Sequence, residues 1–571
     1  MRSKSERAQS RSRVSLKTLF MSCHSGLDPE SCFYGELAAR GQSPGRNDGR
    51  CQIKESVCMK PEEIIQKIEK QLYSADISPE LQNFGFVETV GDEIIRASGL
   101  SGVGYYEEVE FEDGSTGFVL NIDEDYVSIV LLKDSGHIVR GMKVKVTGKI
   151  LSVQVSNSLI GRVINAAGEP IDGFDLKHEN PKTYPVEKIA PGIIERSSVD
   201  RPLKTGIKAI DSMTPIGRGQ RELIIGDRGT GKTAIAIDTI INQKKLDMGL
   251  KRVICIYCSI GQKKSNLAAI TAKLKEEGAM DYTIVVAATA SDPASMQYIA
   301  PLAACAMGEY FMDKGEDVLL VYDDLTKHAW AYRQISLLIK RPAGREAYPG
   351  DIFYLHSRLL ERAARMSDER GGGTLTALPV IETQGNDMSA YIPTNVISIT
   401  DGQIYLEADL FNAGIRPAIN VGLSVSRVGG AAQTKSMKQL SGPVRLELSQ
   451  FRELQAFAQF GSDLDEDTLK RLERGKRITE ILKQPQYKPY DEIAEVISIF
   501  AVTSGLFDDI SVERITQAET GVAEHIKRNC PDIVKKLSSG AKIDDDLKEE
   551  LKKNIAEFKK INNYGSESAA T

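Results

Sequence analysis

The sequence has no apolar stretch approaching the roughly 20 residues that a helix needs to cross a bilayer, so we expect no membrane-spanning helix. It also lacks a basic excess, since 73 Lys and Arg stand against 79 Asp and Glu. The resulting net charge of −6 argues against an overall basic surface for nucleic acid. The remaining composition is that of an ordinary globular protein, and 571 residues suggest about three or four domains.

Cysteine is scarce and unevenly placed. Four of the eight cysteines lie within the first 58 residues. Cys255 and Cys258 form a Cys-x-x-Cys pair in an apolar run, but no second pair stands at the spacing of a zinc site. We interpret this pair as buried thiols in a strand rather than as metal ligands.

Residues 1–58 differ from the rest of the sequence. They hold ten Lys and Arg against six Asp and Glu, and they show no sustained helical or strand period. Their basic beginning is compatible with an organellar transit peptide. We favour instead an extension that is disordered or absent from the mature protein, with Met59 as the functional start.

The sequence from Met59 onward predicts a multidomain α/β protein. Residues 59–84 predict an amphipathic helix, because Ile64, Ile65, Ile68 and Leu72 recur three and four residues apart. Residues 85–150 alternate with a period of two between Gly- and Asp-containing turns, which is typical of an antiparallel β-barrel. Residues 433–571 have helical periodicity.

Residues 151–432 predict an α/β domain with a parallel sheet. Short, continuously apolar runs alternate there with helical segments, and such runs are typical of strands buried on both faces. The runs expected to be strands are 223–225, 253–257, 284–288, 318–322 and 396–399.

The strongest motif is a P-loop, Gly226-Asp227-Arg228-Gly229-Thr230-Gly231-Lys232-Thr233. It follows the apolar run 223–225 and precedes a helical segment, which is the strand–loop–helix order that phosphate binding requires. Lys232 is expected to reach the β- and γ-phosphates of a nucleotide, and the Thr233 hydroxyl to ligate Mg²⁺.

A second element fits the same machinery. The run 318–322 ends in two carboxylates, Asp323 and Asp324. In a P-loop fold the first of them lies at the carboxyl edge of the sheet near the metal, so we predict Asp323 to be in the Mg²⁺ shell, through water.

From about Met59 to Ile561 the sequence resembles the α subunit of F-type ATP synthases, in a bacterial-like form. The resemblance rests on the P-loop and on several longer stretches. These are 306–311, 331–338, 349–351, 354–358, 392–403 and 417–426. It implies a six-stranded type of barrel, a central RecA-like P-loop domain and a C-terminal helical domain.

One position separates α from β subunits. Catalytic β-type subunits carry Gly-Glu-Arg, with a Glu that positions the attacking water, where this protein has Gly261-Gln262-Lys263. An amide cannot accept a proton as a carboxylate does. The resemblance therefore implies a regulatory, non-catalytic site that binds ATP or ADP with Mg²⁺.

The resemblance also implies a role at the neighbouring catalytic site. Arg427, in Ser424-Val425-Ser426-Arg427, matches the arginine that reaches in trans to the β subunit, where such a residue is worth roughly 10³–10⁵ in rate. Ser424 is expected to support that interface.

Further nucleotide contacts follow from the resemblance. Arg228 is expected at phosphate, and Arg416, Pro417, Gln484 and Gln486 at the base and ribose. Gly229 is a departure, because α subunits usually have Gln there.

The implied partners are the β, γ, δ and other subunits of ATP synthase, in an α/β hexamer that makes ATP from ADP and phosphate using proton flow, without nucleic acid. The helix 64–72 resembles the contact with the δ-type subunit. Residues 452–465, with Phe457, Phe460 and Leu464, resemble the surface that faces the central stalk.

The implied location is peripheral, on the cytoplasmic face of the bacterial inner membrane, or on the matrix side in mitochondria if the N-terminus is a transit peptide. The alternative is another hexameric P-loop motor ATPase, of secretion or helicase type. A secretion ATPase would keep a glutamate at position 262, and a helicase would carry a basic or aromatic RNA-binding fold where residues 85–150 are acid-rich.

Overall fold

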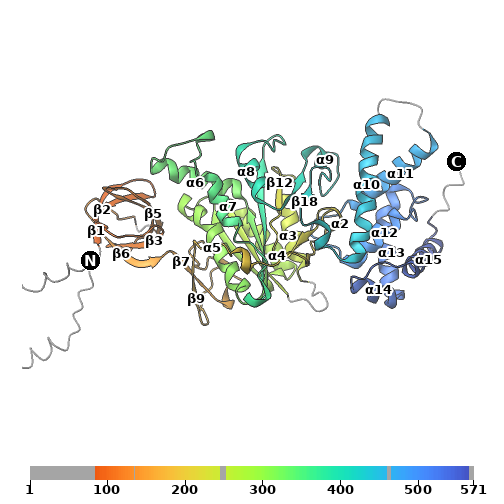
Figure 1. Cartoon of the computed structure of the whole chain (residues 1–571), viewed down its shortest axis with the longest axis horizontal. Coiled ribbons are helices and arrows are strands. Elements are labelled where there is room, and N and C mark those ends of the chain that lie inside the picture. Colours follow the sequence, from red (N-terminus) through yellow and green to blue (C-terminus); the bar gives the residue numbers. More distant parts are fainter. Residues whose placement is uncertain (1–83, 134–135, 245–251, 459–464, 565–571) are drawn as a thin grey trace, which may run out of the picture. The chain divides into compact units, whose positions relative to one another are not determined.

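The computed structural model describes residues 84–133, 136–244, 252–458 and 465–564, with the side chains of 456–458 excepted. Its first domain is a closed antiparallel barrel with the strand order β1-β2-β5-β4-β3-β6 (Figure 1). The strands are β1 (Phe84–Val90), β2 (Ile94–Ser98), β3 (Glu107–Phe111), β4 (Thr116–Ile122), β5 (Val127–Lys133) and β6 (Lys143–Ile150). Closure between β1 and β6 leaves no exposed sheet edge in this barrel as described, and it confirms the predicted fold of the domain.

The central domain is built on an eight-stranded sheet with the order β18-β17-β12-β16-β15-β13-β14-β8. All neighbouring pairs are parallel except β17 with β18. The strands are β8 (Val163–Ile164), β12 (Leu223–Asp227), β13 (Val253–Gln262), β14 (Thr283–Thr289), β15 (Asp317–Asp323), β16 (Thr374–Thr383), β17 (Gly402–Leu406) and β18 (Val425–Ser426). Short strand pairs lie beside it: β7 (Ser152–Val155) with β9 (Lys182–Pro185), and β10 (Pro202–Leu203) with β11 (Ile216–Gly217).

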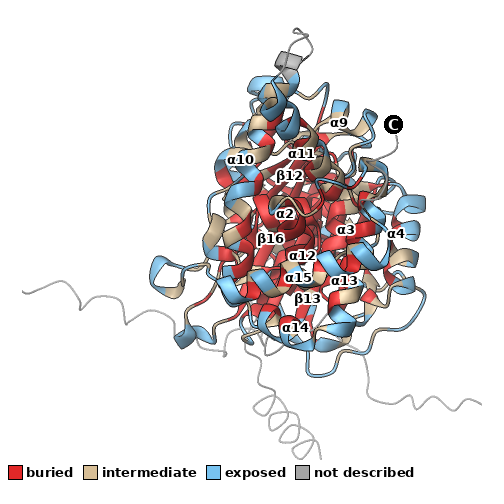
Figure 2. Ribbon diagram, turned by 90° about the vertical axis from the view of Figure 1, so that its right-hand side faces the viewer, coloured by how far each residue is buried: buried red, intermediate tan, exposed pale blue. Residues whose placement is uncertain are grey.

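Helices cover both faces of this sheet, which is why its strands are apolar throughout. The central helices are α2 (Lys208–Met213), α3 (Lys232–Asn242), α4 (Lys264–Glu276), α5 (Ala294–Met312), α6 (Leu325–Leu338), α7 (Ile352–Leu360), α8 (Tyr391–Ile399) and α9 (Ala408–Asn412). One buried cluster joins one sheet face to α5, α6, α7 and α8, and another joins the opposite face to α2, α3, α4 and the C-terminal helices. The sheet accordingly lies in the red interior of Figure 2.

Successive strand residues alternate between these two clusters. Cys258 belongs to the first and Cys255 to the second, so the two thiols of the Cys-x-x-Cys pair point to opposite faces of β13. Burial raises the pKa of both thiols. Both cysteines are thus buried core residues, and they lie on opposite faces of the sheet.

The predicted strand at 396–399 is wrong, because these residues end helix α8. The buried residues of α8 are Ile392, Pro393, Val396 and Ile399, spaced as one face of a helix, while Ser398 is exposed. The strands of this region are instead β16 and β17, which flank β12 on its two sides.

The C-terminal domain is helical, as predicted. It comprises α10 (Lys435–Ala458), α11 (Glu466–Leu482), α12 (Glu492–Thr503), α13 (Ile515–Asn529), α14 (Pro531–Ser538) and α15 (Asp545–Ile561). Their apolar faces are buried, at Val444, Leu448 and Phe451 of α10 and at four α15 positions: Leu547, Leu551, Ile555 and Phe558.

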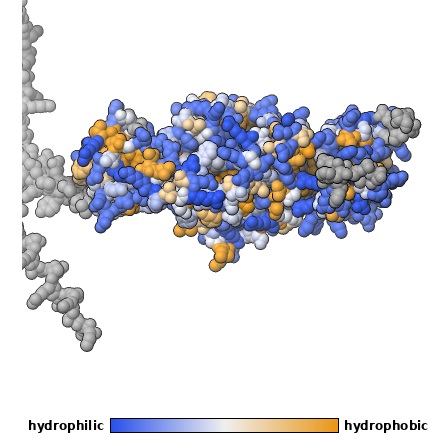
Figure 3. All heavy atoms as spheres, turned by 90° about the horizontal axis from the view of Figure 1, so that it is seen from above, coloured by the Kyte–Doolittle hydropathy of each residue, from blue (hydrophilic) through white to orange (hydrophobic). Residues whose placement is uncertain are grey.

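Some predicted segments lie outside the described residues: the extension 1–58, the helix 64–72, and residues 459–464 of the predicted stalk-facing surface, with Phe460 and Leu464. Within the described ranges, no helix is long and apolar enough to cross a membrane. Most of the surface in Figure 3 is hydrophilic, with a few apolar clusters. The most exposed large apolar side chains are Ile189, Ile193 and Ile194, between β9 and β10, each more than 90% exposed.

Candidate nucleotide-binding site

The P-loop joins the carboxyl end of β12 to the first turn of α3. Gly229 and Gly231 have φ of +83° and +102°, a left-handed backbone that favours glycine. Position 226 has no room for a side chain, because a Cβ there would lie 2.5 Å from the Leu406 carbonyl oxygen of β17. The loop therefore has the backbone that phosphate cradles need, next to a helix N-terminus.

Lys232 is held inside this loop. Its Nζ donates to the carbonyl oxygens of Gly226 and Asp227 at 2.8 and 2.6 Å, and the residue is 7% exposed. Burial lowers the pKa of this ammonium, although four nearby carboxylates oppose the shift. An anion such as a nucleotide phosphate would be attracted to this buried cation.

The two predicted magnesium residues lie together. The Thr233 hydroxyl donates to Oδ2 of Asp323 at 2.7 Å, and the Tyr257 hydroxyl donates to the same oxygen at 2.8 Å. Asp324 faces elsewhere and pairs with Lys327. Among the described residues, no three His, Cys, Asp or Glu side chains gather as a metal cluster. One hydroxyl and one carboxylate fit a Mg²⁺ ion that takes its other ligands from phosphate and water.

Gln262 ends β13 beside Asp323 and is 6% exposed. Its Nε2 donates to the Asp323 carbonyl oxygen at 3.2 Å and contacts the Tyr257 hydroxyl oxygen at 3.4 Å. Its Oε1 accepts from Nδ2 of Asn266 at 2.6 Å. Both ends of the amide are therefore used, one as a donor and one as an acceptor.

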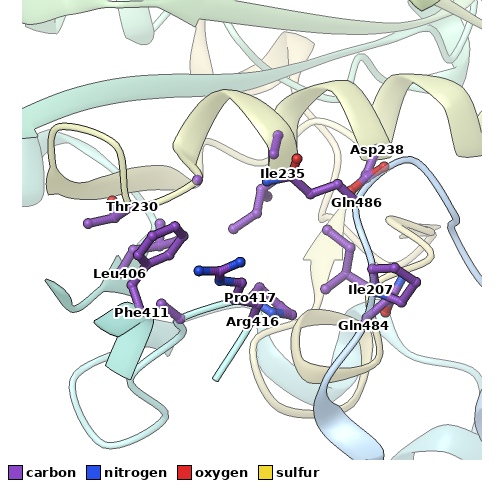
Figure 4. A pocket seen from close by; sticks show the side chains of 14 residues that line it. Ile207, Thr230, Ile235, Asp238, Leu406, Phe411, Arg416, Pro417, Gln484 and Gln486 are labelled. Carbon is purple, nitrogen blue, oxygen red and sulfur yellow. The ribbon is translucent and has the colours of Figure 1, made fainter. Parts of the chain in front are cut away.

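A pocket opens beside α3, and it brings together segments far apart in the sequence (Figure 4). Thr230 and Gly231 of the P-loop line it with Arg416, Pro417, Gln484 and Gln486, the residues that the family resemblance implies at the base and ribose. The remaining lining residues are Ile207, Ala234, Ile235, Asp238, Leu406, Phe411, Ala418 and Pro485. An apolar pocket with a few polar groups next to a phosphate cradle suits a nucleoside.

The pocket wall is braced by its own contacts. The Arg416 guanidinium lies 4.4 Å from the Phe411 ring centroid. Gln484 turns its amide into the protein, donating to the carbonyls of Gly206 and Lys488 at 2.7 and 3.1 Å and accepting from Lys208 N at 3.3 Å. Gln484 thus shapes the wall, while Gln486 is exposed.

The other predicted residues lie apart from this pocket's lining. Asp227 accepts at Oδ1 from Thr383 Oγ1 at 2.7 Å and from Asn386 N at 2.9 Å, so it fastens the loop to β16, and Arg228 is exposed. Arg427 is exposed after β18. Ser424 is buried, donating to the Asn420 carbonyl at 2.6 Å and accepting from Tyr405 N at 3.0 Å.

Two site residues were not predicted from the sequence. Tyr257 lies inside an apolar strand, and nothing in the pattern marks its contact with Asp323. Asp238 did carry a signal, because it is the lone acid in an apolar helical run, 234–241, where a buried carboxylate requires a partner.

The fold and this geometry define a P-loop nucleotide-binding protein. Three family models match the sequence in order: the beta-barrel domain of the ATP synthase alpha/beta family at 81–148, the nucleotide-binding domain of the same family at 206–426, and the C-terminal domain of the ATP synthase alpha/beta subunits at 433–558. The protein belongs to the ATP synthase alpha/beta family. It has all three domains of a subunit of an ATP synthase or related rotary ATPase.

Proposed function

We propose that this protein is the regulatory, non-catalytic α subunit of an F-type proton-translocating ATP synthase. It alternates with catalytic β subunits in a hexamer that makes ATP from ADP and phosphate, and it meets γ, δ and other subunits of the assembly. It is peripheral to the membrane that holds the proton channel, on the cytoplasmic face in a bacterium.

The observation that carries this proposal is the amide of Gln262 beside Asp323. A general base for water needs a free acceptor of high basicity in reach of the reacting phosphate. The Gln262 oxygen is occupied by Asn266, and its nitrogen is spent on the Asp323 carbonyl. This supports a site that holds its nucleotide without turnover.

Residues of this protein have defined tasks in such a site. The P-loop amides and Lys232 bind and orient the phosphates, and Thr233 and Asp323 hold Mg²⁺, which supplies charge neutralisation when bound. Arg416, Pro417 and Gln486 line the space for base and ribose, which Gln484 shapes from behind. The Gln262 amide, whose oxygen already accepts from Asn266, supplies no carboxylate base to this site.

The arginine in trans is supported by its exposure and its anchored backbone. The Arg427 amide donates to the Asp401 carbonyl at 2.8 Å, and β18 pairs with the buried strand β17, so an exposed guanidinium projects from a fixed base. The exposed Ile189, Ile193 and Ile194 support burial of another part of the surface by other subunits.

The test compares ATP turnover by the isolated protein with turnover by its complex with β and γ. We expect the isolated protein to bind Mg-ATP without turning it over, and the complex to be active. Arg427→Ala should reduce turnover of the complex by about 10³-fold or more. Arg528→Ala, an exposed arginine on α13, is the matched control and should leave turnover unchanged. Robust turnover by the isolated protein would instead favour another P-loop motor ATPase.

A further inference from the structure

Asp238 is an unexplained carboxylate in the nucleotide pocket. It lies in α3, six residues after Lys232, is 6% exposed, and lines the pocket at the end away from Thr230 (Figure 4). Its Oδ1 accepts a hydrogen bond from the backbone N–H of Tyr487 at 2.7 Å. The P-loop helix is thereby tied to the segment 484–487, which follows α11 of the C-terminal domain.

The segment 484–487 is held in a constrained shape. Tyr487 has a φ of +62°, a left-handed backbone that is costly for a residue with a side chain. Its ring lies 5.1 Å from Nζ of Lys273, on α4. Gln484 anchors the other end through the carbonyls of Gly206 and Lys488. The hydrogen bond from Tyr487 N to Asp238 links this left-handed residue to the pocket wall.

Opposing influences set the pKa of the Asp238 carboxyl group near neutral pH. Burial raises its pKa to about 7, and Glu277 at the end of α4 acts in the same direction, whereas the Tyr487 N–H and Lys273 oppose it. Arg416, across the pocket, is a further cation on the same lining. The carboxyl group therefore has a reason to change charge in the pH range where cells operate.

We propose that Asp238 is a positioning residue which, when ionised, holds segment 484–487 against the nucleotide and so makes nucleotide affinity fall as the pH falls through neutrality. This inference rests on the proposed nucleotide site and adds its regulation. The ionised carboxylate makes a charge-assisted bond to Tyr487 N–H, and protonation weakens that bond, so the pocket wall loosens. A purely electrostatic role predicts the opposite sign, because removing a negative charge near a polyphosphate would strengthen binding.

The experiment measures the Kd of Mg-ATP for the full-length protein by calorimetry from pH 5.5 to 8.5, at saturating Mg²⁺. Three variants accompany the wild type: Asp238→Asn, Asp238→Ala and the control Asp281→Asn, an exposed acid elsewhere in the same domain. Asparagine keeps an oxygen that can accept from Tyr487 N–H but does not titrate. Titration of the ATP phosphates is common to all four proteins, so the variant-to-wild-type ratio isolates Asp238.

We expect the wild type and Asp281→Asn to bind about tenfold more weakly at pH 5.5 than at pH 8.5, beyond any change seen in Asp238→Asn. Asp238→Asn carries no charge at any pH, so it should bind about tenfold more weakly than the wild type at pH 8.5, keep that affinity in acid and match the wild type at pH 5.5. Asp238→Ala also loses the acceptor oxygen and should be weaker still throughout. Identical pH profiles for the wild type and Asp238→Asn, or tighter wild-type binding in acid, would overturn the inference and leave the proposed function standing. No binding by any of the four proteins at any pH would overturn both.

Discussion

The substitution Gln262→Glu tests whether the site is built for an amide. It exchanges Nε2, a donor, for an oxygen that faces two other oxygens: the Asp323 carbonyl at 3.2 Å and the Tyr257 hydroxyl at 3.4 Å. The Tyr257 proton is already donated to Asp323 Oδ2. An ionised carboxylate introduced here would therefore meet acceptors on that side, beside the Asp323 carboxylate, with Asn266 as its remaining donor.

The loss of stability in Gln262→Glu depends on pH, and the contacts of residue 262 decide whether it grows or shrinks as the pH rises. A buried acceptor that loses its donor costs about 1–3 kcal/mol, more where charge is involved. A protonated carboxyl can donate to the Asp323 carbonyl and avoids most of that cost. The pKa of the new carboxyl is thus raised in the folded state above about 4.3, its usual unfolded value. As the pH rises above that value the unfolded state ionises first, so the variant loses stability relative to the wild type until the folded pKa is passed.

We expect the free energy of unfolding to fall by about 2–3 kcal/mol at pH 8 and by less than about 1 kcal/mol at pH 5, each relative to wild type at the same pH. The assay is urea unfolding followed by the fluorescence of Trp330. This is the sole tryptophan, and it lies in α6, which begins just after Asp323 and Asp324. The matched control is Gln154→Glu at an exposed position of β7, which should show no such pH dependence. A loss that is equal at both pH values, or a gain at pH 8, would show that the site does not require an amide at position 262.

Three further predictions concern stability and the loop. Arg362→Met removes the bidentate guanidinium from the fully buried Glu309 and leaves it only the longer ion pair to the partly exposed Lys188, at 3.6 Å. It should cost about 3–5 kcal/mol in urea unfolding, most of it recovered in Arg362→Met/Glu309→Leu; a single-variant cost under about 1 kcal/mol would contradict this. The hydrogen bond from Arg162 is the main reason why the pKa of Asp172 is lowered from 3.8 to about 2. The ionised Asp172 should therefore add about 2 kcal/mol to the free energy of unfolding above pH ~4. In urea unfolding, the difference in stability between the wild type and Asp172→Asn should be constant there and close as the pH falls toward 2. Gly226→Ala places a Cβ 2.5 Å from a carbonyl oxygen of β17 and should weaken Mg-ATP binding by more than about tenfold, whereas the control Gly442→Ala, in α10, should bind Mg-ATP normally.

The parts of the site that lie within one stretch of sequence could be predicted, whereas contacts between distant segments could not. The P-loop and the strand ending in Asp323 are local patterns with a fixed spacing, and the structure joins them at 2.7 Å through Thr233. The placement of Arg416 and Gln484 came from family resemblance, because nothing in either segment marks it as a pocket wall. The Tyr257 contact had no local signal, since a tyrosine in an apolar strand is ordinary core.

The error at 396–399 has a physical cause. Four apolar or small residues in a row fit a buried strand or the inner face of a helix equally well, and periodicity over so short a run cannot separate them. Tertiary context decided the matter: the run follows Ile392 and Pro393 on one helical face, and the next residues, at Gly402–Leu406, pair with β12. The other predicted runs, 223–225, 253–257, 284–288 and 318–322, lie in β12, β13, β14 and β15 and are confirmed.

The nucleotide pocket is lined by two domains, the central domain and the C-terminal domain. Its phosphate end belongs to the central domain, but its far wall is the segment 484–487, which is joined to that domain by Gln484 and Asp238. A buried ion pair between Lys208 of α2 and Glu519 of α13, 2.7 Å long, crosses the same junction. A nucleotide that fills this pocket would contact both domains and add its own interactions to theirs, so its binding free energy would stabilise the junction. Under the proposed function, in which Gln262 supplies no base for hydrolysis, the bound nucleotide would persist as part of that junction, which is the behaviour expected of a regulatory site.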